Sequence, residues 1–171
     1  QTVRLHDTVI AGVSAHMEFL QWVENLAFST WIRESGSIWG YAMVLTLHTI
    51  GLAILVGVSF AVDLRLLGFG KEAQIGPYER YFPIMWIGFW VNAISGVILL
   101  MADATTKMIN PVFYVKMAFI FLAVWNVRIA QKKLRAGIES PMLAWISIFL
   151  WIGATTAGRL MAYIGPVAGL E

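Results

Sequence analysis

The sequence predicts an all-α protein, a four-transmembrane-helix up-down bundle with an N-terminal amphipathic surface helix and both termini periplasmic. Of its 171 residues, 59% are hydrophobic and 13% are charged, whereas an ordinary soluble domain has roughly 25% charged residues. Four apolar runs are also long enough to cross a bilayer, which takes roughly 20 helical residues. The lipid bilayer is therefore the first partner that this composition predicts.

The first 36 residues differ from the rest of the chain. Residues 1–36 mix apolar with charged side chains and contain no run long enough to span, so we expect an N-terminal periplasmic or interfacial segment. Four apolar residues recur there at helical spacing, namely Phe19, Trp22, Val23 and Leu26. This spacing predicts a helix that lies along the membrane surface.

The remaining residues, 37–171, are predicted to form the transmembrane bundle. Asn110-Pro111 and Ser140-Pro141 mark helix starts, because a helix tolerates proline in its first turn, where the missing N–H would have no partner. From the apolar runs, the spans are expected at about 37–62, 83–102, 112–129 and 141–164.

The distribution of Lys and Arg predicts the orientation. At one end of the spans, the nearby basic residues are Lys107, Arg4 and Arg33. The connections at the other end carry seven: Arg65, Lys71, Arg80, Arg128, Lys132, Lys133 and Arg135. Because positive charge stays on the cytoplasmic side, the richer end is expected inside. This predicts a multi-pass protein of the bacterial inner (cytoplasmic) membrane with periplasmic N- and C-termini.

Composition also excludes several classes of function. The sequence has no cysteine, which excludes disulfides, thiolate metal sites, thioether-attached haem and iron–sulfur clusters. The net charge is +2 and the basic residues are dispersed, so nucleic acid is not an expected partner. The sequence shows no phosphate loop, nucleophile elbow, paired-histidine metal helix or dinucleotide fingerprint. No catalytic residue is therefore assigned.

His48 is the only histidine inside a predicted span, about ten residues or roughly 15 Å deep. On its outer side we expect Lys116, one turn into the third span, Arg159 near the end of the fourth, and Asp103 at the end of the second. Ionisable residues inside a membrane are costly and normally face the bundle interior, so they are functional-site candidates. The alternative is that these cations extend to the interface or form structural ion pairs.

A haem b fits this arrangement. His48 would be an axial ligand, and the propionates would extend outward to Lys116 and Arg159. Small residues beside His48, such as Gly51, could admit a flat macrocycle or could serve close helix packing. The second axial ligand stays open, with candidates among the methionines of the outer half, Met43, Met101, Met108, Met117 and Met161.

The sequence is also compatible with two alternatives to haem. His48 with Met101, Met117 and Met161 would suit copper(I), which prefers thioether and imidazole ligands. Alternatively, the chain is a non-catalytic accessory subunit of a larger membrane complex, with an N-terminal arm that docks on a partner. Because four spans make a thin bundle, a homo-oligomer or a larger complex is expected in each case.

Two further groups of polar residues predict an ion pair and a metal site. Asp63, at the inner end of the first span, is expected to pair with Arg128 as a structural clamp. In the surface segment, a metal could bind the two remaining histidines with a nearby carboxylate; the candidates are His6, Asp7, His16 and Glu18.

Several stretches of the chain resemble known membrane proteins. They are FLQWVE (19–24), WIRES (31–35), LHTIGLAILVG (47–57), VDLRLLG (62–68) and NPVFYVK (110–116). Over about residues 19–130, the chain is similar to a family of bacterial four-span membrane proteins without an established activity.

A more distant similarity joins the chain to two better-known groups. A histidine in the first span and a lysine in a later span resemble the HemJ-type protoporphyrinogen oxidases, which bind haem b, and the CopD-like copper-resistance proteins. The HemJ resemblance implies essential roles for His48 and Lys116. It also implies a functional arginine, for which Arg65 and Arg159 are both candidates.

Overall fold

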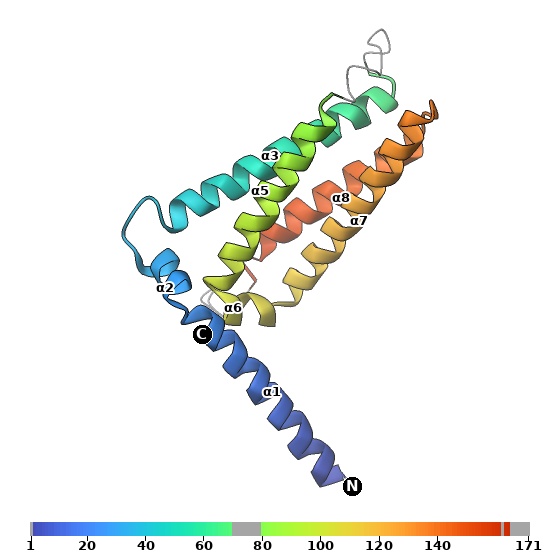
Figure 1. The fold of residues 1–171 in the computed structure, drawn as a ribbon. Helices are drawn as coiled ribbons and strands as arrows, with labels where there is room; N and C mark the ends of the chain where they lie inside the picture. The colour runs from blue at the N-terminus through green and yellow to red at the C-terminus, as the bar shows by residue number, and fades with distance from the viewer. Residues whose placement is uncertain (1, 70–79, 162, 165–171) are drawn as a thin grey trace.

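A computed structural model describes residues 2–69, 80–161 and 163–164, with side chains from Ser14 onward. Its regular secondary structure is all helical, with no strand among the described residues (Figure 1). The helices are α1 (Thr2–Glu24), α2 (Ala27–Glu34), α3 (Tyr41–Leu66), α5 (Phe82–Met101), α6 (Ala104–Ile109), α7 (Pro111–Arg135) and α8 (Pro141–Leu160). Within the described ranges, α3, α5, α7 and α8 are long and apolar enough to cross a membrane. The prediction of an all-α chain with four candidate spans is confirmed.

The helix starts follow the proline positions. The side chain of Asn110 caps α7 by accepting a hydrogen bond from the Val112 N–H at 2.9 Å. Pro111 and Pro141 occupy first-turn positions of α7 and α8, where their missing N–H costs no helical hydrogen bond. Asn110 also donates a hydrogen bond to the carbonyl of Ile164, which ties the start of α7 to the segment that follows α8.

The helix ends differ from the expected bounds. The third span was expected to end near 129, but α7 continues to Arg135 and ends before Gly137, whose φ is 72°. Apolar composition locates only the membrane-embedded part of a helix. The basic last turn extends beyond it, where Lys and Arg favour the negative end of the helix dipole. Conversely, α8 ends at Leu160, short of the expected 164.

The four long helices form an incompletely closed bundle. α3 packs against α5 and α8, and α7 packs against α8, whereas α5 and α7 make few contacts in the described structure. Figure 1 shows α3 beside α5 and α7 beside α8, with α6 at one end of the bundle. The main hydrophobic core, which includes Met85, Ala123, Leu134 and Ala144, lies mostly in the opposite half. The half nearer α6 is therefore left with room for a cavity.

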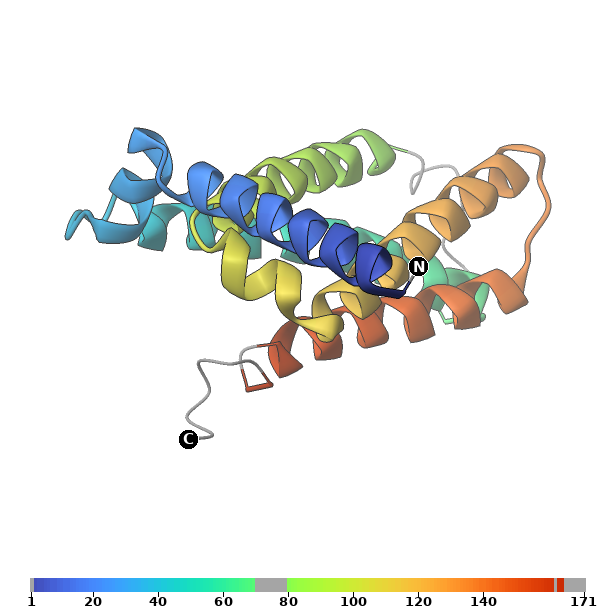
Figure 2. The same ribbon diagram turned by 90° about the horizontal axis from the view of Figure 1, so that it is seen from below.

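The N-terminal segment forms two helices instead of one. α1 runs across the end of the bundle and away from it, and Figure 2, seen from that end, shows α6 beside α1. A carboxylate oxygen of Glu24 accepts hydrogen bonds from the Thr105 N–H and hydroxyl, both at 2.8 Å. Ile32 of α2 is buried against Val44 and Leu99. The segment therefore docks through its C-terminal part. Lys71, which was counted for the orientation, lies outside the described residues.

Candidate functional site

Two adjoining cavities occupy the half of the bundle nearer α6. The mouth cavity, of about 550 Å³, opens toward α6, and the deep cavity, of about 260 Å³, lies further in. The volume of the mouth cavity is in the range of small-molecule and cofactor sites, roughly 300–1,000 Å³, and that of the deep cavity is slightly below it. Both cavities are lined by the same residues where they meet, His48, Gly96, Leu100, Phe113 and Lys116. They therefore form one continuous hollow with His48 at the junction.

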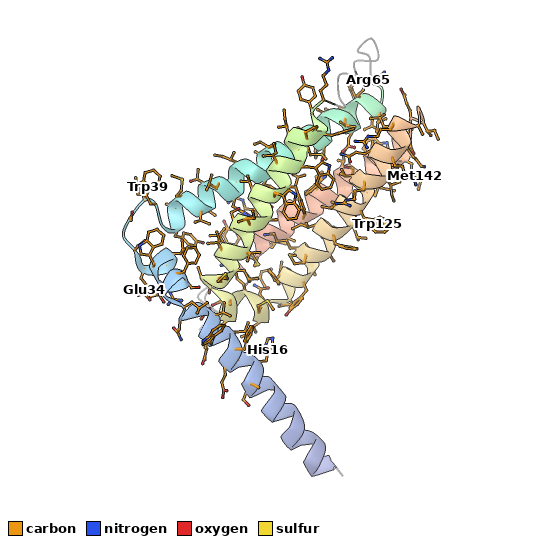
Figure 3. The ribbon with its side chains drawn as sticks, viewed as in Figure 1. His16, Glu34, Trp39, Arg65, Trp125 and Met142 are labelled. Carbon is orange, nitrogen blue, oxygen red and sulfur yellow. The ribbon has the colours of Figure 1, made fainter. Side chains whose placement is uncertain are left out.

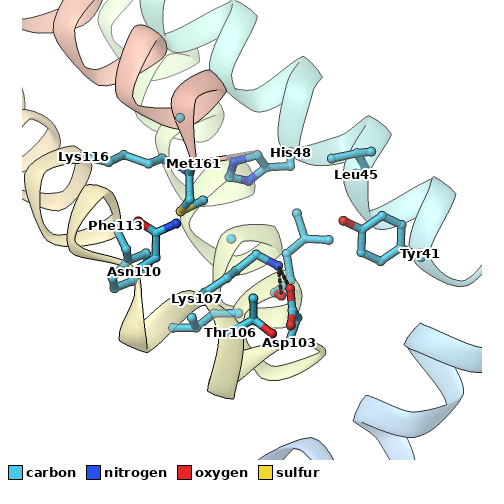
Figure 4. A pocket seen from close by; sticks show the side chains of 14 residues that line it. Tyr41, Leu45, His48, Asp103, Thr106, Lys107, Asn110, Phe113, Lys116 and Met161 are labelled. Atoms are coloured by element: carbon cyan, nitrogen blue, oxygen red, sulfur yellow. Dashed lines mark hydrogen bonds and ion pairs between the residues drawn. The ribbon is translucent and has the colours of Figure 1, made fainter. Parts of the chain in front are cut away.

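The two cavities differ in polarity. The deep cavity is mostly apolar and is lined by Leu52, Leu55, Phe89 and Trp151, among others. Polar side chains line the mouth cavity, and Figure 4 shows them around its opening: Tyr41, Asp103, Thr106, Lys107 and Asn110. An elongated ligand with an apolar body and a charged end would match this change in polarity.

The imidazole of His48 is held through hydrogen bonds at one of its two ring nitrogens, Nδ1. Nδ1 lies 3.0 Å from the backbone carbonyl oxygen of Asn92 and 3.1 Å from Oγ of Ser95. The Ser95 hydroxyl donates to the Val91 carbonyl at 2.6 Å, so its oxygen is free to accept. The Asn92 amide is 3.3 Å from Nδ1 but has a closer acceptor, the His48 carbonyl at 2.8 Å. Two acceptors therefore surround Nδ1, which favours the tautomer with its proton there.

This tautomer leaves Nε2 with its lone pair available. Nε2 makes no hydrogen bond to any residue that the structure describes, and the ring lines both cavities. A histidine that donates through one nitrogen to a carbonyl and keeps the other free has the arrangement of a metal ligand. Gly96 leaves room for the ring, because a Cβ at that position would lie 3.1 Å from Cε1 of His48.

Two lysines approach the same hollow. Lys116 of α7 lines both cavities, and Figure 4 shows it extending toward His48 from the opposite side. Lys116 therefore points into the bundle. Lys107 of α6 also lines the mouth, with its ammonium 2.9 Å from a carboxylate oxygen of Asp103 and 3.4 Å from the Leu99 carbonyl. The mouth therefore has two cations and one carboxylate.

Arg159 does not join this group. It is exposed on α8 and lines neither cavity. Gly158 does line the mouth, but each residue turns a helix by about 100°, so the next side chain points in a different direction. The expected place of Arg159 beside Lys116 is therefore wrong, and Lys107 is found there instead.

Gly51 serves helix packing. A Cβ at Gly51 would lie 2.7 Å from the backbone nitrogen of Asn92 and 2.9 Å from the Gly88 carbonyl oxygen. This close approach of α3 to α5 requires small residues. Gly51 is among the lining residues of neither cavity, so the structure supports packing over the alternative of a place beside a cofactor.

The three methionines named as copper ligands separate into two groups. Met161 lines the mouth cavity and Met117 lines the deep cavity, each together with His48. Met101 lines neither cavity. Met101 is thereby removed from the candidate ligands.

The sequence interpretation missed several residues of the mouth. Lys107 and Asn110 were read only as an orientation signal and a helix cap, and Tyr41 and Phe113 were not singled out. The Asp103–Lys107 spacing of four residues is that of a helical ion pair. It was a usable signal for α6, the short helix that carries Lys107 to the mouth.

The remaining polar candidates do not form the expected groups. His16 lies exposed on α1, apart from the four-helix bundle (Figure 3), whereas the side chains of His6 and Asp7 lie outside the described residues. Among the described residues, no three His, Asp or Glu side chains are grouped so that they could hold a metal. The expected Asp63–Arg128 pair is also absent between these two described residues. The Arg128 guanidinium lies over the Trp86 ring instead, 4.9 Å from its centroid.

Comparison of the chain with protein-family models, curated proteins and solved structures found no match. The resemblance to HemJ-type and CopD-like proteins stays a prediction.

Proposed function

We propose that this protein binds haem b in the bacterial inner membrane, with His48 as an axial ligand, and acts in electron transfer or as a redox subunit. One observation carries the proposal. The His48 ring is fixed at Nδ1 by the Asn92 carbonyl and Ser95, while Nε2 is unengaged where the two cavities meet. Such support from a carbonyl orients a ligating histidine and raises its basicity.

The residues around the hollow also fit a haem. The apolar lining of the deep cavity would contact the macrocycle, and Gly96 leaves the space beside the histidine ring that a larger residue would occupy. Lys116 and Lys107 at the mouth would pair with propionates through charge-assisted hydrogen bonds. When bound, haem would supply one-electron chemistry.

The protein's own groups would have distinct tasks in this proposal. Asn92 and Ser95 orient His48, and the apolar residues Leu52, Leu55 and Trp151 keep water from the deep cavity. Asp103, through its ion pair with Lys107, positions one of the two cations. Met161 and Met117 are the candidates for a second axial ligand, since each shares a cavity with His48.

An absorption spectrum of the protein purified in detergent tests the proposal. We expect a Soret band, with the haem identified as type b by pyridine extraction, and we expect His48→Ala to lose most of this band. His16→Ala, which changes a histidine exposed on α1, is the matched control and should keep the spectrum. A Soret band of equal intensity in His48→Ala would contradict the assignment.

Copper(I) is the second candidate ligand of the same histidine. The observation in its favour is that Met161 and Met117 line the hollow with His48, since thioether and imidazole donors suit this ion. Metal analysis of the same preparation separates the two candidates. A stoichiometric amount of copper that disappears in His48→Ala, without a Soret band, would favour copper over haem.

A further inference from the structure

A second group of buried polar side chains lies at the end of the bundle away from α6. It consists of Ser59 and Asp63 of α3, Asn126 and Gln131 of α7, and Ser147 of α8, which line a cavity of about 20 Å³. All are buried, with Asp63 only 4% exposed. About fifteen residues of α3, or roughly 22 Å, separate Asp63 from His48. This inner cavity is therefore distinct from the His48 hollow.

Three atoms of this group lack a hydrogen-bond partner. They are Oδ2 of Asp63, Nε2 of Gln131 and Oγ of Ser147. The Ser147 hydroxyl is near enough to Asp63 to influence its carboxyl group, yet neither Oγ nor Oδ2 completes a hydrogen bond. Buried polar atoms are almost always paired in proteins. Unpaired polar atoms around one small cavity therefore indicate a bound ion or water molecule that bridges them.

The carboxylate also lacks a counter-charge. Among the described residues, no ion pair joins Asp63 to a cation. Arg65, two residues on, lies 3.9 Å from Glu139, and Arg128 lies over Trp86. The α5 residues at the cavity, Phe82 and Met85, carry no charge. An ionised carboxylate in this environment requires one positive charge.

The other side chains can offer oxygen atoms to a cation. The Ser59 hydroxyl donates to the Leu55 carbonyl at 2.9 Å, and the Asn126 amide nitrogen donates to the Leu143 carbonyl at 3.0 Å. Because Ser59 and Asn126 donate these hydrogen bonds to backbone carbonyls, their side-chain oxygens keep lone pairs that a cation can use. A half-turn of the Gln131 amide would exchange its unpaired nitrogen for oxygen without a change of shape.

Size and charge select the kind of cation. A volume of about 20 Å³ admits one atom-sized guest. Mg²⁺ usually keeps several waters, and Ca²⁺ takes six to eight oxygen ligands, often from several carboxylates. The cavity has one carboxylate and no space for additional waters. These features favour a small, dehydrated, monovalent ion.

We propose that this inner cavity binds a single Na⁺ ion through Asp63, supported by oxygens of Ser59, Asn126, Gln131 and Ser147. A water molecule would bridge the unpaired atoms but would not compensate an ionised Asp63 carboxylate. The Na⁺ site does not rest on the proposed haem function, because it uses different residues at the other end of the bundle.

Thermal unfolding of the full-length protein in detergent tests the ion. We expect the Tm to rise saturably with NaCl, but not with KCl or N-methylglucamine chloride at equal ionic strength. At a Na⁺ concentration of about one hundred times Kd, the rise should be roughly 5 °C or more. Asp63→Asn, which keeps the side-chain shape, should abolish the rise, whereas the exposed control Glu34→Gln should retain it.

Several outcomes would overturn the proposal. One is an equal Tm in Na⁺ and N-methylglucamine; another is a Na⁺-specific rise that persists in Asp63→Asn. A Tm that responds to pH and not to Na⁺ would identify a proton as the occupant. If Asp63→Asn does not fold, Ser147→Ala should weaken ²²Na⁺ binding to the purified protein at least several-fold, and unchanged binding would contradict the site. The Soret band is measured separately, so the failure of one proposal is distinguishable from the failure of the other.

Discussion

At the scale of single residues, His48 depends on neighbours from another helix. Asn92 and Ser95 of α5 hold Nδ1, and the Asn92 side chain also binds the His48 carbonyl at 2.8 Å. The ring orientation is therefore determined by α5, although α3 carries the residue. Loss of such a hydrogen-bond partner of a ligating histidine typically costs roughly 10–100-fold in metal affinity.

Substitution of Ser95 tests this support. Ser95→Ala removes the oxygen 3.1 Å from Nδ1, so we expect haem affinity to fall about tenfold, measured by haem titration of the purified protein. Thr155→Ala is a matched control, because both residues donate to a carbonyl four positions earlier, at 2.6 Å for Ser95 and 2.9 Å for Thr155. Equal affinities in the two variants would show that Ser95 does not support the ligand.

At the scale of helices, the contact between α3 and α5 places the histidine. Gly51 and Gly88 let the two backbones approach closely, with a Cβ at Gly88 only 2.8 Å from the Ile54 side chain. Small residues at such contacts replace the hydrophobic driving force that helices lack inside a bilayer. Gly51 therefore affects the position of His48, because it allows the close contact between α3 and α5.

A pair of glycine substitutions on α3 tests this role. Gly51→Ala would bring a methyl group to 2.7 Å from the Asn92 backbone nitrogen, so we expect destabilisation of about 1–3 kcal/mol. Gly57→Ala has no atom within 4 Å of the new Cβ and should be neutral or slightly stabilising, because alanine favours helix. Denaturant unfolding in mixed micelles measures both, and similar free energies of unfolding would exclude a close-packed contact at Gly51.

These helices also show what the sequence could and could not predict. Apolar run length and the Asn110-Pro111 cap identified the spans and the start of α7, because both are local properties. Arg159 was placed wrongly, since depth along a helix does not give the direction of a side chain around it. Lys107 was missed because α6 returns over the mouth of the bundle, and such a turn depends on contacts such as that of Glu24 with Thr105.

At the scale of the whole molecule, the half of the bundle that holds the main core and the half that holds the two cavities end beside different sets of charged residues. The half around the main core ends near Arg65 and the basic last turn of α7, whereas the hollow half ends at α6 and the N-terminal helices. If the richer positive end is cytoplasmic, the mouth cavity opens on the periplasmic side. The proposed haem and Na⁺ sites would then lie near opposite faces of the membrane.

Single cysteines test this orientation, because the chain has none of its own. We expect Ser37→Cys, in the connection before α3, to react with a membrane-impermeant maleimide in intact spheroplasts. Ile138→Cys, exposed between α7 and α8, should react only after permeabilisation. The reverse pattern would place the mouth cavity on the cytoplasmic side, with no effect on its interior geometry.

The separation of α5 from α7 has a consequence for how the proposed haem would affect the fold. Few protein contacts join these two helices, and residues from both line the deep cavity. A haem seated between α5 and α7 would therefore act as a structural bridge between the two hairpins. Its loss would free the hairpins to move apart within the plane of the membrane.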